Sequence, residues 1–264
     1  ASHDPSTFLP GLQVLWASDE GYSLEDSTWM EAWGYVSQIT ARDLNADGFT
    51  DLVTASYSAT GLSSIYWGSS DGFSYEDRQD LDTQGHAWDV LTEDFNSDGF
   101  DDLLFSNQKD IAGEFDVSSR VFWGSDAGFS DADVTELSTY TAAGTCAGDL
   151  NADGFPDAII TENEWFIGTE TGEVATIFWG SADGLSDDSA TVVPALGAVG
   201  CSIWDLNLDG HPDLALANLS DGVTYEVDVW IYWGSEDGLD LTTYSSLPPH
   251  SANSIATHPL EDGY

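Results

Sequence analysis

One ten-residue phrase that recurs five times constrains the fold of this chain more than any other feature. Its second copy reads IYWGSSDGFS, and the five copies begin at Val14, Ile65, Val121, Ile177 and Ile231. The tryptophans of successive copies lie 51, 56, 56 and 54 residues apart. A second phrase, DLNADGFTD in its first copy, alternates with the first and begins at Asp43, Asp94, Asp149 and Asp205. A regular period of this length indicates an array of similar structural units.

Each period consists of short segments that are typical of β-strands. In the first full unit they are VSQITARDL, DLVTASYS and GLSSIYWGS, followed by a polar stretch that ends near Asp82. Val, Ile, Thr and aromatic residues fill these runs, while Gly, Asn, Asp and Ser separate them. No segment keeps the 3.6-residue period of a helix. Three or four short strands per unit are typical of a propeller blade, whereas solenoid repeats are shorter. We therefore predict an all-β fold, a β-propeller.

We expect one propeller domain over residues 1–264, with five blades. Residues 250–264 fall in phase with HAWDVLTEDFNSDGF from His86, so they resemble the first strand and the loop of a fifth unit, although His258 and Leu260 replace its acidic-loop residues. Residues 11–34 supply the outer strands that this unit lacks. Sharing one blade between the chain ends would close the ring and remove two exposed sheet edges. The alternative is that the chain is part of a larger, seven-bladed ring.

The second repeated phrase predicts calcium sites. D-x-N-x-D-G-x-x-D places side-chain oxygens at positions 1, 3, 5 and 9 and a backbone carbonyl at position 7, a hard oxygen donor set that suits Ca²⁺ better than Mg²⁺. We expect about four sites, with these ligands: Asp43, Asn45, Asp47, Phe49, Asp51; Asp94, Asn96, Asp98, Phe100, Asp102; Asp149, Asn151, Asp153, Phe155, Asp157; Asp205, Asn207, Asp209, His211, Asp213. Phe49, Phe100, Phe155 and His211 would contribute only their carbonyl oxygens.

Two other interpretations of these loops are less consistent with the sequence. An EF-hand needs a bidentate Glu at position 12 between two helices, but the residues there are Thr54, Phe105, Ile160 and Leu216. Asp, Asn and Gly also form ordinary turns without any metal. That explanation suits one loop, but four loops with the same residues in the same register favour a shared ligand.

On these residues the chain resembles FG-GAP (VCBS-type) repeat propellers, which include the blades of integrin α-subunits and related bacterial and fungal propeller lectins. The similarity runs from about Gly11 to Tyr264. It implies calcium in the loop between the first and second strands of each blade, on the side opposite the usual ligand-binding face. The chain differs from the family in having five units rather than seven, a fifth loop without ligands and extreme acidity. We therefore transfer no ligand site from the family.

Charge excludes several classes of partner. The chain has 48 Asp and Glu against 4 Lys and Arg, a formal net charge of −44. A nucleic-acid-binding protein needs a basic face, so we expect no nucleic-acid partner. An anionic membrane would repel the chain for the same reason, and no apolar run is long enough to span a bilayer. Because counterions screen so acidic a surface, we expect salty or calcium-rich surroundings and an extracellular, secreted or cell-surface location.

The cysteines and histidines suggest structural roles. Cys146 and Cys201 lie one column apart in neighbouring repeats, three residues before Asp149 and four before Asp205. Since adjacent residues of a strand point to opposite faces, we expect two buried free thiols rather than a disulfide. His86 and His250 occupy equivalent positions and could bind a transition metal at a ring mouth, but we favour hydrogen bonds to backbone groups.

Aromatic residues outside the repeated strands are the candidate ligand contacts: Trp29, Trp33, Tyr35, Trp165, Phe166 and Tyr225. Aromatic rings beside amides and acids are suited to stack on sugars, although packing between blades would also explain them. No nucleophile elbow, HExxH motif or phosphate loop is present. We therefore expect a non-catalytic recognition or adhesion module for a glycan or an extracellular protein. The alternative is a polysaccharide lyase or hydrolase on the same scaffold.

Overall fold

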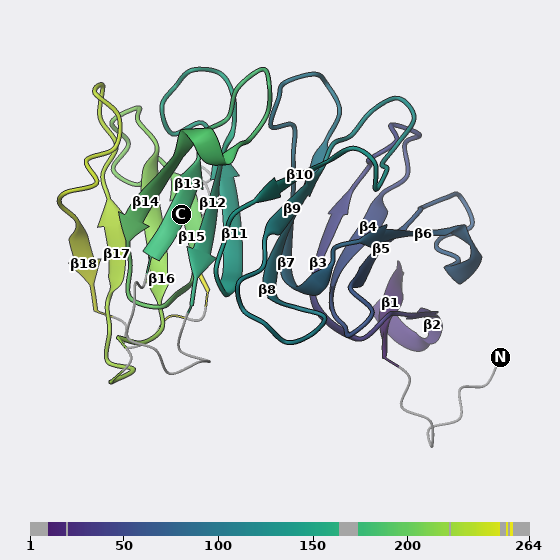
Figure 1. Cartoon of the computed structure of the whole chain (residues 1–264). Helices are drawn as coiled ribbons and strands as arrows, with labels where there is room; N and C mark the ends of the chain where they lie inside the picture. The colour runs from purple at the N-terminus through teal and green to yellow at the C-terminus, as the bar shows by residue number, and fades with distance from the viewer. Residues whose placement is uncertain are drawn as a thin grey trace.

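The computed structural model describes residues 10–19, 21–163, 174–221, 223–248, 252 and 254–255. Within them the chain forms four four-stranded antiparallel sheets and one two-stranded sheet, arranged side by side as an arc (Figure 1). Two short 3₁₀ turns, η1 (Tyr75–Asp77) and η3 (Asp187–Ser189), connect strands. No helix among these residues is long and apolar enough to cross a membrane. The structure confirms the predicted all-β propeller-type fold.

Each complete sheet is a meander in which consecutive strands are neighbours. The first contains β3 (Tyr35–Arg42), β4 (Asp51–Tyr57), β5 (Leu62–Tyr66) and β6 (Arg78–Asp82), and the second β7 (Gly85–Glu93), β8 (Asp102–Asp110), β9 (Ser119–Phe122) and β10 (Val134–Leu137). The third contains β11 (Ala142–Gly148), β12 (Asp157–Glu162), β13 (Val174–Phe178) and β14 (Ala190–Pro194), and the fourth β15 (Ala198–Trp204), β16 (Asp213–Asn218), β17 (Val229–Tyr232) and β18 (Ser245–Leu247).

Apolar side chains fill the spaces between neighbouring sheets. Val53 and Ile65 of the first sheet join Leu103, Phe105 and Phe122 of the second in one buried cluster. Clusters of the same kind lie between the second and third sheets and between the third and fourth. The second strand of each sheet is buried on both faces, as in β16, where every residue is buried. This explains why the second strands read as continuous apolar or small-residue runs rather than as alternating ones.

The innermost strands surround a small central cavity of about 240 Å³. Its walls come from β3, β7, β11 and β15 and from a fifth segment that contains Ser254 and Ile255. Ala252 donates its backbone N–H to the carbonyl of Asn218 (3.1 Å), and Ile255 packs against the outer face of the fourth sheet. Residues 252, 254 and 255 therefore lie where the first strand of a fifth unit is expected.

The N-terminal hairpin is the outer half of a unit. Strand β1 (Gly11–Ser18) pairs with β2 (Gly21–Glu31), and the indole N–H of Trp16 donates to the Thr28 hydroxyl, 12 residues further on, at 3.0 Å. The same bond, with the same separation, joins the third and fourth strands of three complete sheets, from Trp123, Trp179 and Trp233. Hence β1 and β2 occupy third- and fourth-strand positions. Their expected pairing with residues 256–264 lies outside the described residues and stays a prediction.

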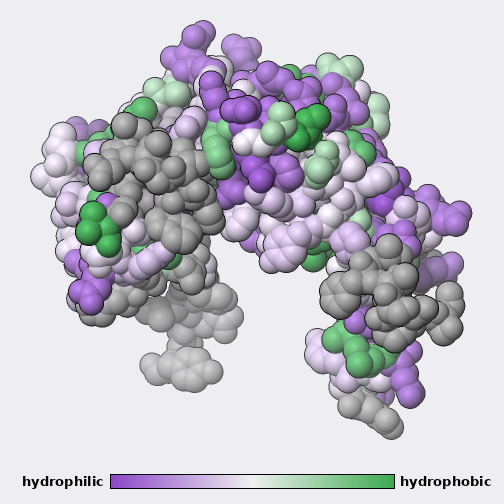
Figure 2. All heavy atoms as spheres, turned by 60° about the horizontal axis from the view of Figure 1, so that its bottom comes forward, coloured by the Kyte–Doolittle hydropathy of each residue, from purple (hydrophilic) through white to green (hydrophobic). Residues whose placement is uncertain are grey.

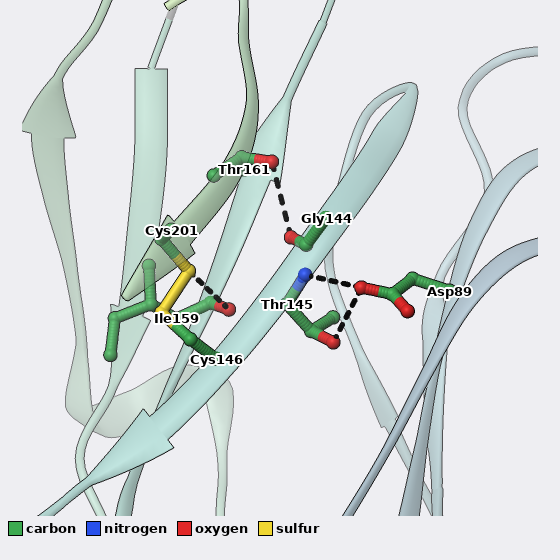
Figure 3. Close-up of a disulfide and its surroundings, with 7 residues drawn as sticks. All are labelled: Asp89, Gly144, Thr145, Cys146, Ile159, Thr161 and Cys201. Atoms are coloured by element: carbon green, nitrogen blue, oxygen red, sulfur yellow. Dashed lines mark hydrogen bonds between the residues drawn. A yellow bond between two sulfur atoms is a disulfide. The ribbon is translucent and has the colours of Figure 1, made fainter. Parts of the chain in front are cut away.

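The prediction of two free thiols is wrong. Cys146 on β11 and Cys201 on β15 form a disulfide with a Cα–Cα distance of 5.7 Å, which links the third sheet to the fourth (Figure 3). The two cysteines do point to opposite faces of their own strands. In a propeller, however, one face of each sheet packs against the opposite face of the next, so opposite orientations bring the two sulfurs together.

Candidate functional site: the acidic loops and the opposite face

The four acidic loops each join the first and second strands of a complete sheet and share one pattern of hydrogen bonds. In the first loop the Asp43 carboxylate accepts from the N–H groups of Asp47 (3.1 Å) and Gly48 (2.9 Å). The Asn45 side-chain oxygen accepts from Asp47 N–H at 3.0 Å, and the Asp47 carboxylate accepts from Phe49 N–H at 2.8 Å. The corresponding bonds recur in the other three loops. The loops are therefore alike in geometry as well as in sequence.

The fourth residue of every loop adopts a left-handed backbone conformation. The φ angles are 56° at Ala46, 55° at Ser97, 58° at Ala152 and 60° at Leu208. For residues with a Cβ this conformation costs roughly 1–2 kcal/mol, and the exposed Leu208 side chain gains no burial in return (78% exposed). Gly or Asn would adopt this conformation at lower cost. Turn formation alone therefore does not explain why Ala, Ser or Leu occupies the fourth position.

The ninth residue of each loop is a fully buried aspartate that anchors the loop to the sheet. Asp51 accepts backbone N–H groups from Leu44 (2.9 Å) and, across the sheet, from Gly68 (2.7 Å). The same pair of bonds is made by Asp102, Asp157 and Asp213. Burial raises the pKa of Asp102 to about 7 and that of Asp157 to about 6, and the acids at positions 1 and 5 of the loop act in the same direction. Each loop thus concentrates negative charge around a carboxylate that is already poorly solvated.

The donor set of each loop fits a hard divalent cation. Asp43, Asn45, Asp47 and Asp51 supply oxygen atoms from nine consecutive residues, and each carboxylate oxygen keeps an acceptor position beyond the backbone bond that it makes. In the part of the chain that the structure describes, no group of three or more His, Cys, Asp or Glu side chains converges as a metal cluster. The carboxylates of Asp43 and Asp47 accept N–H groups of their own loop in this arrangement.

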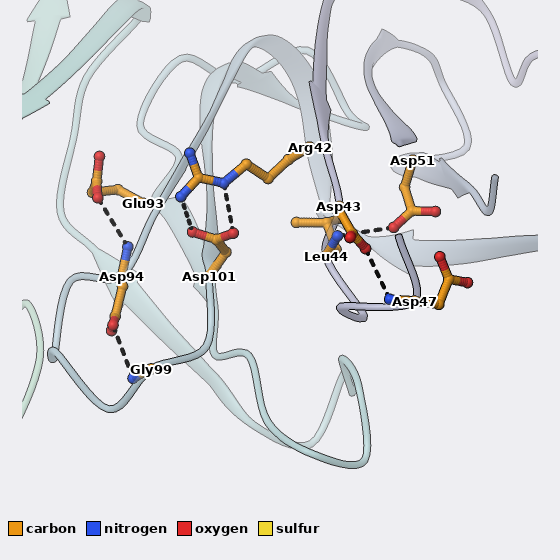
Figure 4. A network of polar contacts seen from close by, with 9 residues as sticks. All are labelled: Arg42, Asp43, Leu44, Asp47, Asp51, Glu93, Asp94, Gly99 and Asp101. Carbon is orange, nitrogen blue, oxygen red and sulfur yellow. Dashed lines mark hydrogen bonds and ion pairs between the residues drawn. The ribbon is translucent and has the colours of Figure 1, made fainter. Parts of the chain in front are cut away.

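Neighbouring loops also contact one another. Arg42, which directly precedes the first loop, makes two hydrogen bonds to the carboxylate of Asp101 in the second loop, at 2.7 and 2.8 Å (Figure 4). This carboxylate raises the pKa of Arg42. The Ser97 hydroxyl in turn donates to the Gly154 carbonyl of the third loop at 3.3 Å. The first three acidic loops are therefore linked to one another along one end of the sheets.

At the opposite end of the sheets lies a cluster of aromatic and cationic side chains that the sequence did not reveal. Tyr57, at the end of β4, contacts His86 (ring centroids 4.5 Å apart) and Trp88 (5.9 Å) on β7. The Lys109 ammonium lies 5.1 Å from the Tyr57 ring centroid. We call Tyr57, His86, Trp88 and Lys109 the Tyr57 cluster. Tyr35, which is 69% exposed, pairs with Tyr57 across β3 and β4.

The Tyr57 cluster is the one place among the described residues where a cation lacks a carboxylate partner. Arg42, Arg78 and Arg120 each make an ion pair, whereas Lys109 has no carboxylate oxygen within 4.0 Å. Burial, and then Lys109, lower the pKa of His86, so its ring is neutral at neutral pH. The buried His86 Nδ1 has no hydrogen-bond partner in the described structure, which differs from the backbone bond that we expected. His250 lies outside the described residues.

The predicted ligand contacts lie on several elements. Trp29 is on β2, and Trp33 precedes β3, where the Arg78 guanidinium stands 5.1 Å from its ring centroid. Tyr35 begins β3 beside the Tyr57 cluster, and Tyr225 is in the loop before β17. Trp29, Trp33, Tyr35 and Tyr225 are 37–69% exposed. Trp165 and Phe166 lie outside the described residues. Of the four members that the structure describes, only Tyr35 lies beside the Tyr57 cluster.

Comparisons with known proteins agree with this architecture. Residues 43–105 match the family model of the FG-GAP-like repeat. Human integrin alpha-6 is 28% identical over 149 residues, which are 52% of this chain and 13% of that protein. The chain thus spans only a small part of this relative.

Solved structures are similar in fold. The crystal structure of the V. cholerae biofilm matrix protein Bap1 aligns with a TM-score of 0.52 and 16% identity, over 88% of this chain and 31% of that chain. The crystal structure of BBS1N in complex with ARL6DN, soaked with mercury, aligns with a TM-score of 0.50 and 9% identity, over 82% of this chain and 59% of that one. At these identities the likeness concerns the fold.

Together the sheets, their order and these matches define a propeller-type domain. The match of residues 43–105 to the FG-GAP-like repeat and the weaker similarity to integrin alpha-6 support the resemblance that the sequence predicted.

Proposed function

We propose that this chain is a calcium-binding, non-catalytic recognition domain of an extracellular or cell-surface protein. The observation that carries the proposal is the fourfold recurrence of one loop geometry, with the same bonds, the same left-handed fourth residue and the same buried aspartate. Carboxylates about 4 Å apart repel by roughly 4 kcal/mol per pair at an effective dielectric constant of 20. A bound Ca²⁺ would reverse the sign of that contribution and tie the first two strands of each sheet together.

The disulfide supports an extracellular location. Cys146 and Cys201 are the two cysteines of the chain and are bonded to each other. Disulfides persist in oxidising compartments and are rare in the cytosol. An integrin and a biofilm matrix protein among the similar proteins are consistent with adhesion outside the cell.

The proposed contact surface is the Tyr57 cluster together with the neighbouring Tyr35. Their aromatic rings are exposed or partly exposed and lie at the end of the sheets away from the acidic loops. Tyr35 offers an exposed ring for stacking, and Lys109 offers a cation without a carboxylate partner. Aromatic faces and polar groups together suit sugars, so a lectin-like activity is the first candidate. A protein ligand is the second candidate. The similarity to an integrin and to a biofilm matrix protein is consistent with it.

Calcium dependence is tested by thermal unfolding of the metal-free chain with and without CaCl₂. The expected result is a melting temperature that rises with calcium and falls again with a chelator. Asp153→Asn, in the third loop, should reduce the rise, while Asp183→Asn should leave it unchanged, because Asp183 is an exposed acid of the same unit outside the loop. A melting temperature that calcium does not affect would contradict the proposal.

The ligand class is tested on a glycan array in millimolar calcium, with Tyr35→Ser as the variant. Binding that Tyr35→Ser abolishes, at an unchanged melting temperature, supports a lectin. A blank array with a protein captured from the native surroundings, again dependent on Tyr35, supports adhesion to a protein. Turnover of a polysaccharide would show the alternative, a lyase or hydrolase, and would contradict the non-catalytic assignment.

A further inference from the structure

Lys109 differs from the other three basic residues of the chain in its surroundings. Arg42, Arg78 and Arg120 each form an ion pair with a carboxylate, at 2.7, 2.7 and 3.3 Å. Among the described residues, no carboxylate oxygen lies within 4.0 Å of the Lys109 ammonium. Because the chain has 48 acidic and only 4 basic residues, a basic side chain without an acidic partner is unexpected and needs an explanation.

The acidic residue next to Lys109 is held in its own turn. The Asp110 carboxylate accepts the backbone N–H groups of Ala112 and Glu114, both at 2.8 Å. The Asp110 N–H donates to the carbonyl oxygen of Glu114, also at 2.8 Å. These bonds close the turn at the end of β8 and leave the Lys109 ammonium available to an acidic group from outside the chain.

Two cross-strand pairs place Lys109 beside aromatic rings. His86 on β7 pairs with Lys109 on β8, and Tyr35 on β3 pairs with Tyr57 on β4. The Tyr57 ring connects the two pairs, because its centroid lies 4.5 Å from that of the His86 ring and 5.1 Å from the Lys109 ammonium nitrogen. Tyr35 is the most exposed of these rings, at 69%. A cation and an exposed ring therefore lie at the same end of two neighbouring sheets.

The Tyr57 cluster carries a single positive charge. Burial, and then the neighbouring Lys109, lower the pKa of His86, so at neutral pH Lys109 alone is charged. The whole chain has a formal net charge of −44, which repels a ligand with many acidic groups. Salt screens this repulsion beyond about 8 Å at physiological ionic strength. One acidic group placed directly at Lys109 is therefore attracted, whereas a polyanion is not.

The surface at this end of the sheets suits a sugar better than a protein. The acidic loops lie at the upper ends of the sheets in Figure 1, and Figure 2 brings the opposite, lower ends toward the viewer. Among the coloured residues on that side, the apolar ones form small groups between polar ones. Protein interfaces bury a broader apolar centre, whereas a sugar needs one or two ring faces and a few polar groups.

We propose that the Tyr57 cluster and the neighbouring Tyr35 bind a sugar that carries one acidic group, a carboxylate or a sulfate, within an otherwise neutral glycan. The Lys109 ammonium contacts the acidic group, and the Tyr35 ring stacks against the C–H groups of the sugar. An ammonium has three donors on a flexible stem, so it accommodates either acid. This inference rests on the lectin-like function proposed above and names its class of ligand.

The test is a glycan array in millimolar calcium and about 0.15 M NaCl, near physiological ionic strength. The array holds matched pairs that differ only in the acidic group: a uronic acid against its neutral parent sugar, and a sulfated sugar against the unsulfated one. Calorimetry then gives the affinities of the best pairs. The acidic member should bind at least about threefold more tightly than its neutral partner, and the two kinds of pair show which acid the site prefers. An oligosaccharide with an acid on every sugar should bind no more tightly than one with a single acid.

Three variants assign the preference to Lys109. Lys109→Gln should abolish the preference for the acidic member and leave the affinity for the neutral member unchanged, and Lys109→Arg should keep the preference. Val192→Glu is the matched control, because it makes the same change in net charge from an exposed position on the outer strand β14. It should leave the preference intact. The melting temperatures of all three variants, compared with that of the parent, separate loss of binding from loss of folding.

The outcomes that overturn this inference are distinct from those that overturn the function on which it rests. Equal binding of both members of every pair, or a preference that survives Lys109→Gln, would contradict the role of Lys109 and leave a lectin for neutral sugars. A preference that Val192→Glu also removes would show attraction by net charge alone. A chain that binds no glycan, and instead binds a protein through Tyr35, would exclude a sugar ligand altogether.

Discussion

Removing the disulfide between Cys146 and Cys201 should destabilise the chain by a predictable amount. The bond closes a loop of 55 residues, and the chain-entropy model gives about 4 kcal/mol for a loop of this length at 25 °C. At roughly 2 °C per kcal/mol for a chain of 264 residues, the melting temperature should fall by about 8 °C. The loss should be greatest in the fourth sheet, because the bond ties β15 to β11 (Figure 3).

The assay compares the oxidised chain, the reduced chain and the double variant Cys146→Ser/Cys201→Ser by calorimetry, with hydrogen exchange to locate the loosened strands. Reductant should lower the melting temperature of the parent and leave the double variant unchanged. Two reactive thiols in the untreated, denatured chain would refute the disulfide. A shift below about 2 °C would refute the entropic argument while leaving the bond itself in place.

Three further predictions follow from individual contacts. Asp157→Ala should cost about 2–6 kcal/mol in urea unfolding, since two buried N–H groups lose their acceptor at about 1–3 kcal/mol each; the exposed Asp183→Ala should be near neutral. Gly180→Ala should cost about 1–3 kcal/mol because its Cβ meets a backbone oxygen at 2.2 Å, and Ala17→Gly should show no comparable gain. The lowered pKa of His86 means that the unfolded chain takes up this proton first, so His86 contributes a loss of stability as the pH drops below 6.5, opposite in sign to the contributions of Asp102 and Asp157, whose pKa values are raised. His86→Gln should therefore raise the melting temperature at about pH 5 relative to that at about pH 8 when compared with the parent, and identical pH profiles would exclude this contribution.

The repeat made the fold predictable from the sequence. Five tryptophan phrases and four acidic phrases locate the third strands and the loops between the first and second strands, because identical local sequences meet identical neighbours in a ring. The same periodicity placed residues 254–255 beside the inner strands. The orientation of Cys146 and Cys201 was also inferred correctly. The conclusion that the two thiols stay free was wrong, because the orientation of a side chain on its own strand does not say which face of the neighbouring sheet it contacts.

The surface features were harder to predict. Tyr57, His86, Trp88 and Lys109 come from two sheets and three strands, and nothing in their local sequence links them. Ile39 is 41% exposed whereas Val90, its equivalent one unit later, is 4% exposed, and nothing in the local sequence indicates this difference. The residue after the repeated Trp is Ala17 in the hairpin and glycine in the complete sheets, and the reason for the glycine became clear only from the backbone oxygen that lies against it.

The number of calcium ions bound per chain tests the central claim most directly. Isothermal titration of the metal-free chain with CaCl₂, checked by elemental analysis of the dialysed complex, should give about four, one for each loop beginning at Asp43, Asp94, Asp149 and Asp205. Replacing the first aspartate of one loop with asparagine should reduce the number by one. A chain that binds no calcium under these conditions, and whose melting temperature calcium leaves unchanged, would show that the loops are turns without a metal and would contradict the account.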